Sequence, residues 1–237
     1  MNLHARTLTF FAVALLIVAP LAGQEILTAV NYLDTVAERY GTVDDYIADV
    51  VMTTTEETMS GTLYYRRPNL IRIDFEDPPE QVLVSNGETL TVYVPRFDVV
   101  LQQTLRAREG DGSGADLASE RGLQLMRENY SVAYLESPDP VPLDAGDGAD
   151  DDAAGDELVT KLRLDWRSTS EQFRQLTVSV TEERLIRRIV GITVDYEEVQ
   201  FDFTNVRVNQ NVPPARFEYD PPASANVFEG FLFDNEG

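Results

Sequence analysis

The sequence predicts a mainly β protein in which one curved antiparallel sheet wraps around one or two helices. About ten segments alternate apolar and polar residues with the period of a strand, and only two segments have the period of a helix. The strands follow one another too closely for the helical crossovers that parallel strands require. Prolines and glycines separate most of the segments, as in an antiparallel meander.

The N-terminal half should hold one helix and a run of strands. Residues 25–40 carry apolar side chains at helical spacing, and Gly41 is expected to end that helix. Asn86-Gly87 lies between two strand patterns and is typical of a type I′ hairpin turn, which needs positive φ at both central residues. The expected strands are residues 47–54, 62–66, 70–76, 81–85, 89–94 and 98–103.

The middle of the chain differs in composition. Residues 106–118 are rich in Gly and Asp and are expected to form a loop, and residues 117–130 can form a helix. Residues 137–157 hold eight carboxylates, three prolines and no basic residue, which predicts a disordered insertion or a solvated loop; a loose Ca²⁺ site is a minor alternative. Strands resume at residues 158–166, 173–181, 185–194 and 197–208, and a change of phase near Thr204 predicts a β-bulge in the last of them.

The N-terminus reads as a secretory signal. Residues 1–24 combine Arg6, an apolar run and small residues at Ala22 and Gly23. The rest, residues 25–237, fits one domain. The chain has no cysteine, and its one histidine, His4, lies within the signal. The mature part therefore cannot build a Cys/His zinc site, a Cys nucleophile or a His-based catalytic triad.

Charge narrows the function further. The formal net charge of −22 disfavours binding to nucleic acid and to anionic membranes. The acidic pairs, such as Glu56-Glu57 and Glu197-Glu198, are adjacent in sequence, so in strands their side chains point to opposite faces. No spacing selects a catalytic pair, and we expect a protein that is not an enzyme and uses neither a metal nor another cofactor.

The residues between Gly61 and Pro95 resemble one family closely. Gly61, Leu63, Arg67-Pro68-Asn69, Asp77-Pro78, Val82-Leu83-Val84-Ser85, Gly87, Thr89-Leu90, Tyr93 and Pro95 match the pattern of the LolA family of outer-membrane lipoprotein carriers. Asn86 replaces the usual Asp, and Thr91 stands where a Trp often does. A second match lies at Phe217-Glu218-Tyr219-x-Pro221-Pro222. The resemblance implies an open half-barrel of about 10–11 strands covered by a helical lid.

Alternation along the strands suggests which side chains share an interior. The residues alone favour an ordinary closed core, whereas the resemblance implies a cavity that holds acyl chains. The expected lining comprises Leu27, Val30 and Leu33 on the helix and Leu63, Tyr65, Ile71, Ile73, Phe75 and either Val82 or Leu83 on the strands. The resemblance also implies a gating role for Arg67, whose guanidinium can bind backbone carbonyls of a lid and release them when lipid enters.

The resemblance further implies where the protein works and with what. It implies a monomeric carrier in the periplasm that takes acylated lipoproteins from an inner-membrane ABC-type releasing complex. An outer-membrane receptor, where one is present, would accept the cargo. The alternative is a periplasmic sensor, or a carrier of lipid or glycolipid, built on the same fold.

Overall fold

The computed structural model describes residues 27–105, 118–144, 157–169 and 171–230. The signal 1–24, most of the expected loop 106–118 and the centre of the acidic segment lie outside these residues. The helices are α1 (Ala29–Gly41) and α2 (Glu120–Asn129), with short 3₁₀ turns at Pro95–Phe97 and Pro214–Phe217. The strands are β1 (Asp45–Thr53), β2 (Thr58–Arg66), β3 (Leu70–Asp77), β4 (Val82–Ser85), β5 (Thr89–Val94), β6 (Val99–Thr104), β7 (Tyr130–Tyr134), β8 (Val141–Pro142), β9 (Leu158–Trp166), β10 (Phe173–Val180), β11 (Ile186–Thr193), β12 (Glu198–Val208) and β13 (Asn226–Glu229).

One large sheet organises the molecule. Its order is β13-β6-β5-β4-β3-β2-β1-β12-β11-β10-β9-β7, with β8 paired to β9 beside that path. The pairs are antiparallel except for β13, which joins β6 in parallel at one end of the sheet. β1 pairs with both β2 and β12, so the first and last long strands meet in the middle. The mainly β, open-sheet class predicted from the sequence is thus confirmed.

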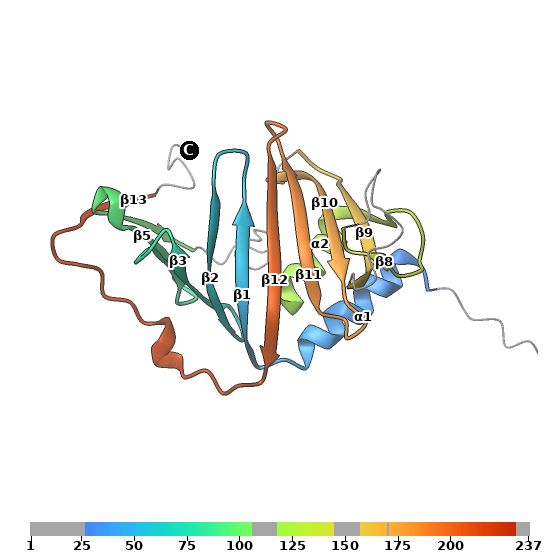
Figure 1. Ribbon diagram of the computed structural model, residues 1–237, viewed down its shortest axis with the longest axis horizontal. Coiled ribbons are helices and arrows are strands. Elements are labelled where there is room, and N and C mark those ends of the chain that lie inside the picture. The colour runs from blue at the N-terminus through green and yellow to red at the C-terminus, as the bar shows by residue number, and fades with distance from the viewer. Residues whose placement is uncertain (1–26, 106–117, 145–156, 170, 231–237) are drawn as a thin grey trace, which may run out of the picture.

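Both helices lie against the half of the sheet formed by β7 and β9–β12, whereas within the described part of the chain no helix covers β3–β6 (Figure 1). α1 begins at Thr28, whose hydroxyl accepts a hydrogen bond from the Asn31 N–H at 3.2 Å. Its apolar side packs on the sheet, and Leu33 and Val36 are fully buried. We call the side of the sheet that meets the helices the helix face.

The opposite side of the sheet carries the chain that follows β12, and we call residues 209–225 the strap and this side the strap face. The strap runs from the end of β12 past β2–β5 to β13 (Figure 1). Phe217 in the strap is only 1% exposed, and Val84 and Val100 on the strap face are also buried. The Asp74 carboxylate bonds Arg72 at 2.7 Å and Arg216 of the strap at 2.6 Å. The strap, which contains the Phe217 motif of the sequence analysis, therefore covers the strap face in the half of the sheet away from the helices.

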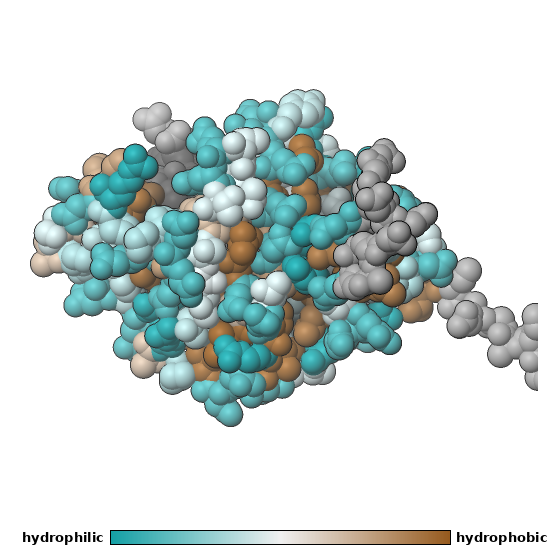
Figure 2. All heavy atoms as spheres, in the orientation of Figure 1, coloured by the Kyte–Doolittle hydropathy of each residue, from teal (hydrophilic) through white to brown (hydrophobic). Residues whose placement is uncertain are grey.

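The remaining surface is largely polar. In the view of Figure 2 hydrophilic side chains cover most of the molecule, and hydrophobic side chains gather mainly near its lower middle. This agrees with the acidic composition of the chain. Among the described residues, no helix is long and apolar enough to cross a membrane.

Local expectations can be compared with the structure. Strands β5 and β9 have the bounds expected from the sequence, and the other expected strands agree within a few residues, whereas β7, β8 and β13 were not expected. The β-bulge expected near Thr204 is confirmed. Between Thr204 and Arg207, β12 has one residue more than the stretch of β1 paired with it, and the φ of Asn205 is 51°. The helix expected at residues 25–40 is described from Ala29 to Gly41, and that at 117–130 is α2.

The expected type I′ turn is wrong. The Asn86 N–H donates to the Thr89 oxygen at 3.2 Å, so the two central residues are Gly87 and Glu88. Of these two, only Gly87 has positive φ, at 90°, which is the pattern of a type II′ turn with Gly in first place. The Asn86 side chain instead closes the turn, accepting from the N–H groups of Glu88 and Thr89.

The flanks of the acidic segment 137–157 contact the sheet. Residues 145–156 lie outside the described part, but both flanks are ordered. Leu143 is buried, and its N–H donates to the Glu157 oxygen at 2.9 Å. Asp144 accepts a 2.6 Å bond from Arg188, which lowers the pKa of that carboxyl, and Glu157 bonds Arg187 at 2.8 Å. The apolar Leu143 and this arginine pair hold the flanks to the sheet, which composition alone did not reveal.

Candidate functional site

A continuous line of apolar side chains crosses the helix face of the sheet. Cross-strand partners follow one another from β1 through β2, β3, β4, β5 and β6 to β13, and successive partners lie on the same face. We call this line the apolar row. Its members are Ala48, Leu63, Ile73, Leu83, Val92, Leu101 and Phe228.

The two ends of the apolar row have different environments. Ala48 and Leu63 are buried in the core beneath the helices. From Ile73 to Leu101 the side chains are only half-buried, and Phe228 is 55% exposed. Exposed apolar surface on adjoining strands is unusual in a monomeric protein and indicates a binding surface.

The length of the open part suits an acyl chain. Ile73, Leu83, Val92, Leu101 and Phe228 lie on five neighbouring strands. At about 4.8 Å between strands the open part is about 19 Å long. The hydrocarbon depth of one bilayer leaflet is about 15 Å, half of the bilayer core. One acyl chain can therefore lie along the row from end to end.

The structure unites only some of the lining residues expected from the sequence. Leu33, Leu63, Tyr65 and Ile71 belong to one buried core under α1, and Ile73 packs against its edge. Phe75 is buried farther along β3, where it lies over Gly61; a Cβ on that glycine would come within 2.8 Å of the Phe75 Cα.

The first helix contributes less than expected. Leu33 is buried, Val30 is half-buried, and Leu27 is 40% exposed just before the helix begins. The Leu27 carbonyl accepts a 2.7 Å bond from the Tyr134 hydroxyl, so the residue is tied to β7 through its backbone. Leu27 thus lies at the far end of α1 from the helix-free strands.

Leu83, Val92, Leu101 and Phe228 extend the site beyond the residues expected from the sequence. Of the expected pair, Leu83 lies on the helix face and Val82 on the strap face, because Leu83 is paired with Ile73. The sequence predicts the strand at residues 89–94 that contains Val92, but it does not predict which face of the sheet Val92 lies on. Phe228 had no such signal, because its parallel pairing with Leu101 joins distant parts of the chain.

Arg67 ties the sheet to the end of α1. One nitrogen of its guanidinium, NH2, donates to the Gly41 carbonyl and, at 3.1 Å, to the Val43 carbonyl. These carbonyls belong to the last residue of α1 and to the turn before β1. A guanidinium suits this position because it offers several donors in a fixed plane.

The residues around Arg67 fix the neighbouring turns. The Asn69 amide donates to the Gly87 carbonyl at 3.3 Å, and the Tyr65 hydroxyl donates to the Pro68 carbonyl at 3.2 Å. Gly87 has a φ of 90°, a backbone conformation that residues with a Cβ rarely adopt, so the β4–β5 turn favours glycine there. Arg67-Pro68-Asn69 is therefore the point where α1, β2 and the β4–β5 hairpin meet.

A second anchor holds α1 to the sheet. The Tyr40 hydroxyl accepts a 3.1 Å bond from the Ile186 N–H, and burial raises the pKa of Tyr40 to about 12. Tyr46 stacks on Tyr65 with ring centroids 5.0 Å apart, and its hydroxyl bonds the Ala118 carbonyl ahead of α2. The helices are thus attached by a few polar contacts in addition to their apolar side.

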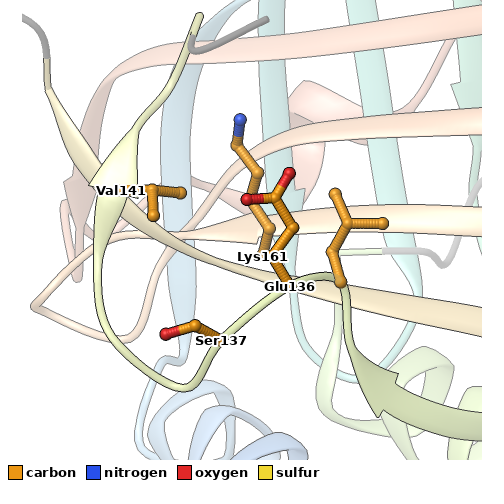
Figure 3. Close-up of a pocket in the computed structure, with 5 residues that line it drawn as sticks. Glu136, Ser137, Val141 and Lys161 are labelled. Atoms are coloured by element: carbon orange, nitrogen blue, oxygen red, sulfur yellow. The ribbon is translucent and has the colours of Figure 1, made fainter.

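A small pocket lies elsewhere, at the junction of β8 and β9. Glu136, Ser137, Val141 and Lys161 surround it together with Leu135 (Figure 3). In the strand order it lies at the opposite end of the sheet from β3–β6, and it has no continuity with the apolar row. It therefore does not enlarge the candidate site.

Comparison with known proteins shows which family this chain resembles. A model described as outer membrane lipoprotein carrier protein LolA matches residues 50–133. An outer-membrane lipoprotein carrier protein of Pseudomonas aeruginosa strain UCBPP-PA14 is 25% identical over 225 residues, which cover 93% of this chain and 97% of that protein. Another, from Nitrosospira multiformis, is 24% identical over 172 residues, or 72% of each chain. The chain is thus similar to the LolA family of outer membrane lipoprotein carrier proteins.

The LolA match covers the strands that carry the site. Residues 50–133 include β2–β6, with Arg67 and all but the two ends of the apolar row. A crystal structure of an uncharacterized conserved protein from Thermus thermophilus has the same fold, with a TM-score of 0.52 at 13% identity over 84% of this chain and 98% of that one. The sequence comparison thus gives the similarity to the LolA family, and the structural comparison gives the fold.

Proposed function

We propose that this protein is a periplasmic chaperone that holds the acyl chains of lipoproteins and carries them from the inner to the outer membrane. The observation that supports it is the apolar row, buried at one end and open at the other, in a chain similar to the LolA family. An inner-membrane ABC-type complex would load the carrier, and an outer-membrane receptor would unload it.

The energetics favour a shallow open surface over a deep closed cavity. Burying a chain of sixteen carbons is worth on the order of 12 kcal/mol relative to water, at about 0.8 kcal/mol per CH₂. The bilayer offers the same gain, so transfer from membrane to carrier is close to neutral. A half-exposed row binds strongly relative to water yet can release its cargo to a better acceptor.

In this proposal Arg67 controls access to the row. It holds the end of α1 through the carbonyls of Gly41 and Val43, beside the boundary between the covered and open parts of the helix face. Acyl chains that push under the helix would have to break these bonds. The gating role is accordingly assigned to Arg67 and to no other charged residue.

The proposal is tested with the mature protein, residues 25–237, and an environment-sensitive hydrophobic fluorophore. The probe is expected to bind at about one site and to be displaced by a diacylated peptide, but not by the same peptide without acyl chains. Tyr196→Ser, at an exposed aromatic on the β11–β12 turn away from the row, serves as a control and should bind the probe as wild type does. A folded sample that binds neither probe nor acylated peptide would contradict the carrier function.

A further inference from the structure

The last strand of the sheet has an unpaired side. β13 pairs with β6, and among the described residues no strand lies on its other side. All four of its residues are exposed, with Val227 at 53% and Phe228 at 55%. An exposed edge of this kind is a template for the addition of another strand.

The hydrogen bonds of β13 show which backbone groups are available. The Asn226 N–H donates to the Asp98 carbonyl and the Gly230 N–H to the Gln102 carbonyl, both at 2.9 Å. Successive N–H groups along a strand point to opposite sides. The N–H groups of Val227 and Glu229 therefore point away from β6, to the unpaired side.

This edge lies at the open end of the apolar row, because Phe228 is its last member. An acyl chain placed along the row would direct its tail to the buried end, where Leu63 and Ala48 offer only hydrocarbon. The polar end, which carries the peptide, would then emerge at β13. The inference rests on the proposed function, which places the acyl chain on this row.

We propose that the free edge of β13 binds the extended peptide that follows the acylated residue of a lipoprotein, as an added strand. Strand addition draws its affinity from main-chain hydrogen bonds and is therefore tolerant of the peptide's sequence. Such tolerance suits a carrier that must accept many different lipoproteins. The apolar row holds the lipid and the edge holds the first residues of the protein.

The test compares three ligands on the mature protein: a diacylated peptide, the same lipopeptide with alternate backbone nitrogens methylated, and a diacylglycerol lipid of the same chain length without peptide. Methylation removes the peptide's ladder donors and leaves its acyl chains intact. The protein variants are Val227→Pro, which removes an outward N–H, and Val227→Ala, which keeps it. The lipopeptide is expected to bind wild type and Val227→Ala about tenfold more tightly than it binds Val227→Pro. The methylated lipopeptide is expected to bind wild type about tenfold more weakly than the unmethylated one does.

Binding of the diacylglycerol lipid separates the two proposals. If that lipid binds wild type and Val227→Pro equally, the variant is folded and the row is intact, so a loss confined to the lipopeptide supports strand addition. If methylated and unmethylated lipopeptides bind wild type equally, strand addition is wrong while the carrier function stands. If none of the three ligands binds wild type, both proposals fail.

Discussion

At the scale of single residues, Arg67 combines a structural contact with a proposed function. The resemblance to the LolA family implies that Arg67 binds backbone carbonyls, which suits a guanidinium because it has donors and no acceptor. The sequence could not predict which carbonyls, because Gly41 and Val43 are 26 and 24 residues away and are brought near only by packing of α1. The contact therefore depends on the fold, and only the residue type was visible in the sequence.

The gating role makes a prediction about Arg67. Replacement by Leu should leave the protein folded and able to bind lipopeptide, but should slow transfer of the cargo to acceptor membranes. Arg67→Lys should also be impaired, because a lysine ammonium does not hold its N–H groups in the fixed plane in which the NH2 group of Arg67 donates to both carbonyls. Arg163→Leu is the control, since the Arg163 side chain forms an ion pair with Asp165 on the exposed surface of β9. Transfer by Arg67→Leu at the wild-type rate would refute the role.

At the scale of elements, local patterns located most of the strands but not their partners. The alternation of apolar and polar residues predicts the bounds of β5 and β9, and the phase change near Thr204 predicts the bulge. Both features are contained within one strand. β7 and β13 were not recognised, since each is short and is defined by pairing with a distant strand. The acidic composition of residues 137–157 predicts a disordered or solvated segment, so the sequence does not indicate that its one leucine, Leu143, is buried.

The attachment of α1 to the sheet yields a second prediction, in which two buried tyrosines behave differently. Tyr40→Phe leaves the Ile186 N–H buried without a partner and should lower the free energy of unfolding by about 1–3 kcal/mol. Tyr32 is equally buried, but its hydroxyl has no hydrogen-bond partner among the described residues. Tyr32→Phe should therefore be neutral or stabilising.

Urea unfolding of both tyrosine variants, followed by circular dichroism, measures this difference. The packing of the ring is preserved in each variant, so only the hydroxyl is tested. Equal changes in the free energy of unfolding would show that the Tyr40–Ile186 bond does not help to hold α1.

At the scale of the whole molecule, the sheet has two unequal halves. Helices cover the helix face of β7 and β9–β12, whereas the strap covers only the strap face of β2–β5 (Figure 1). The sequence could predict an apolar interior from alternation, but the division into covered and open parts follows from where the helices lie. For this reason the expected site residues Leu33, Leu63, Tyr65 and Ile71 fall in the closed core, and the open surface begins at Ile73.

This division predicts that a hydroxyl introduced on the helix face will weaken binding of the acyl chain, whereas one introduced on the strap face will not. Val92 on the helix face and Val82 on the strap face are both half-buried and lie on adjacent strands. Val92→Thr places a hydroxyl against the acyl chain without changing the shape of the side chain. Binding should weaken by about 1–2 kcal/mol, which is about 5- to 30-fold in Kd. Val82→Thr, the matched control, should bind as wild type.

The measurement is titration of the fluorophore and of the diacylated peptide into each valine variant, with thermal unfolding as a check on the fold. Both variants should keep a similar Tm, because each site is partly solvated and a hydroxyl there can still reach water. Weakened binding in Val92→Thr alone would locate the acyl chain on the open row. Equal Kd values for the two variants would place the lipid elsewhere, and the covered half beneath α1 would then have to open to receive it.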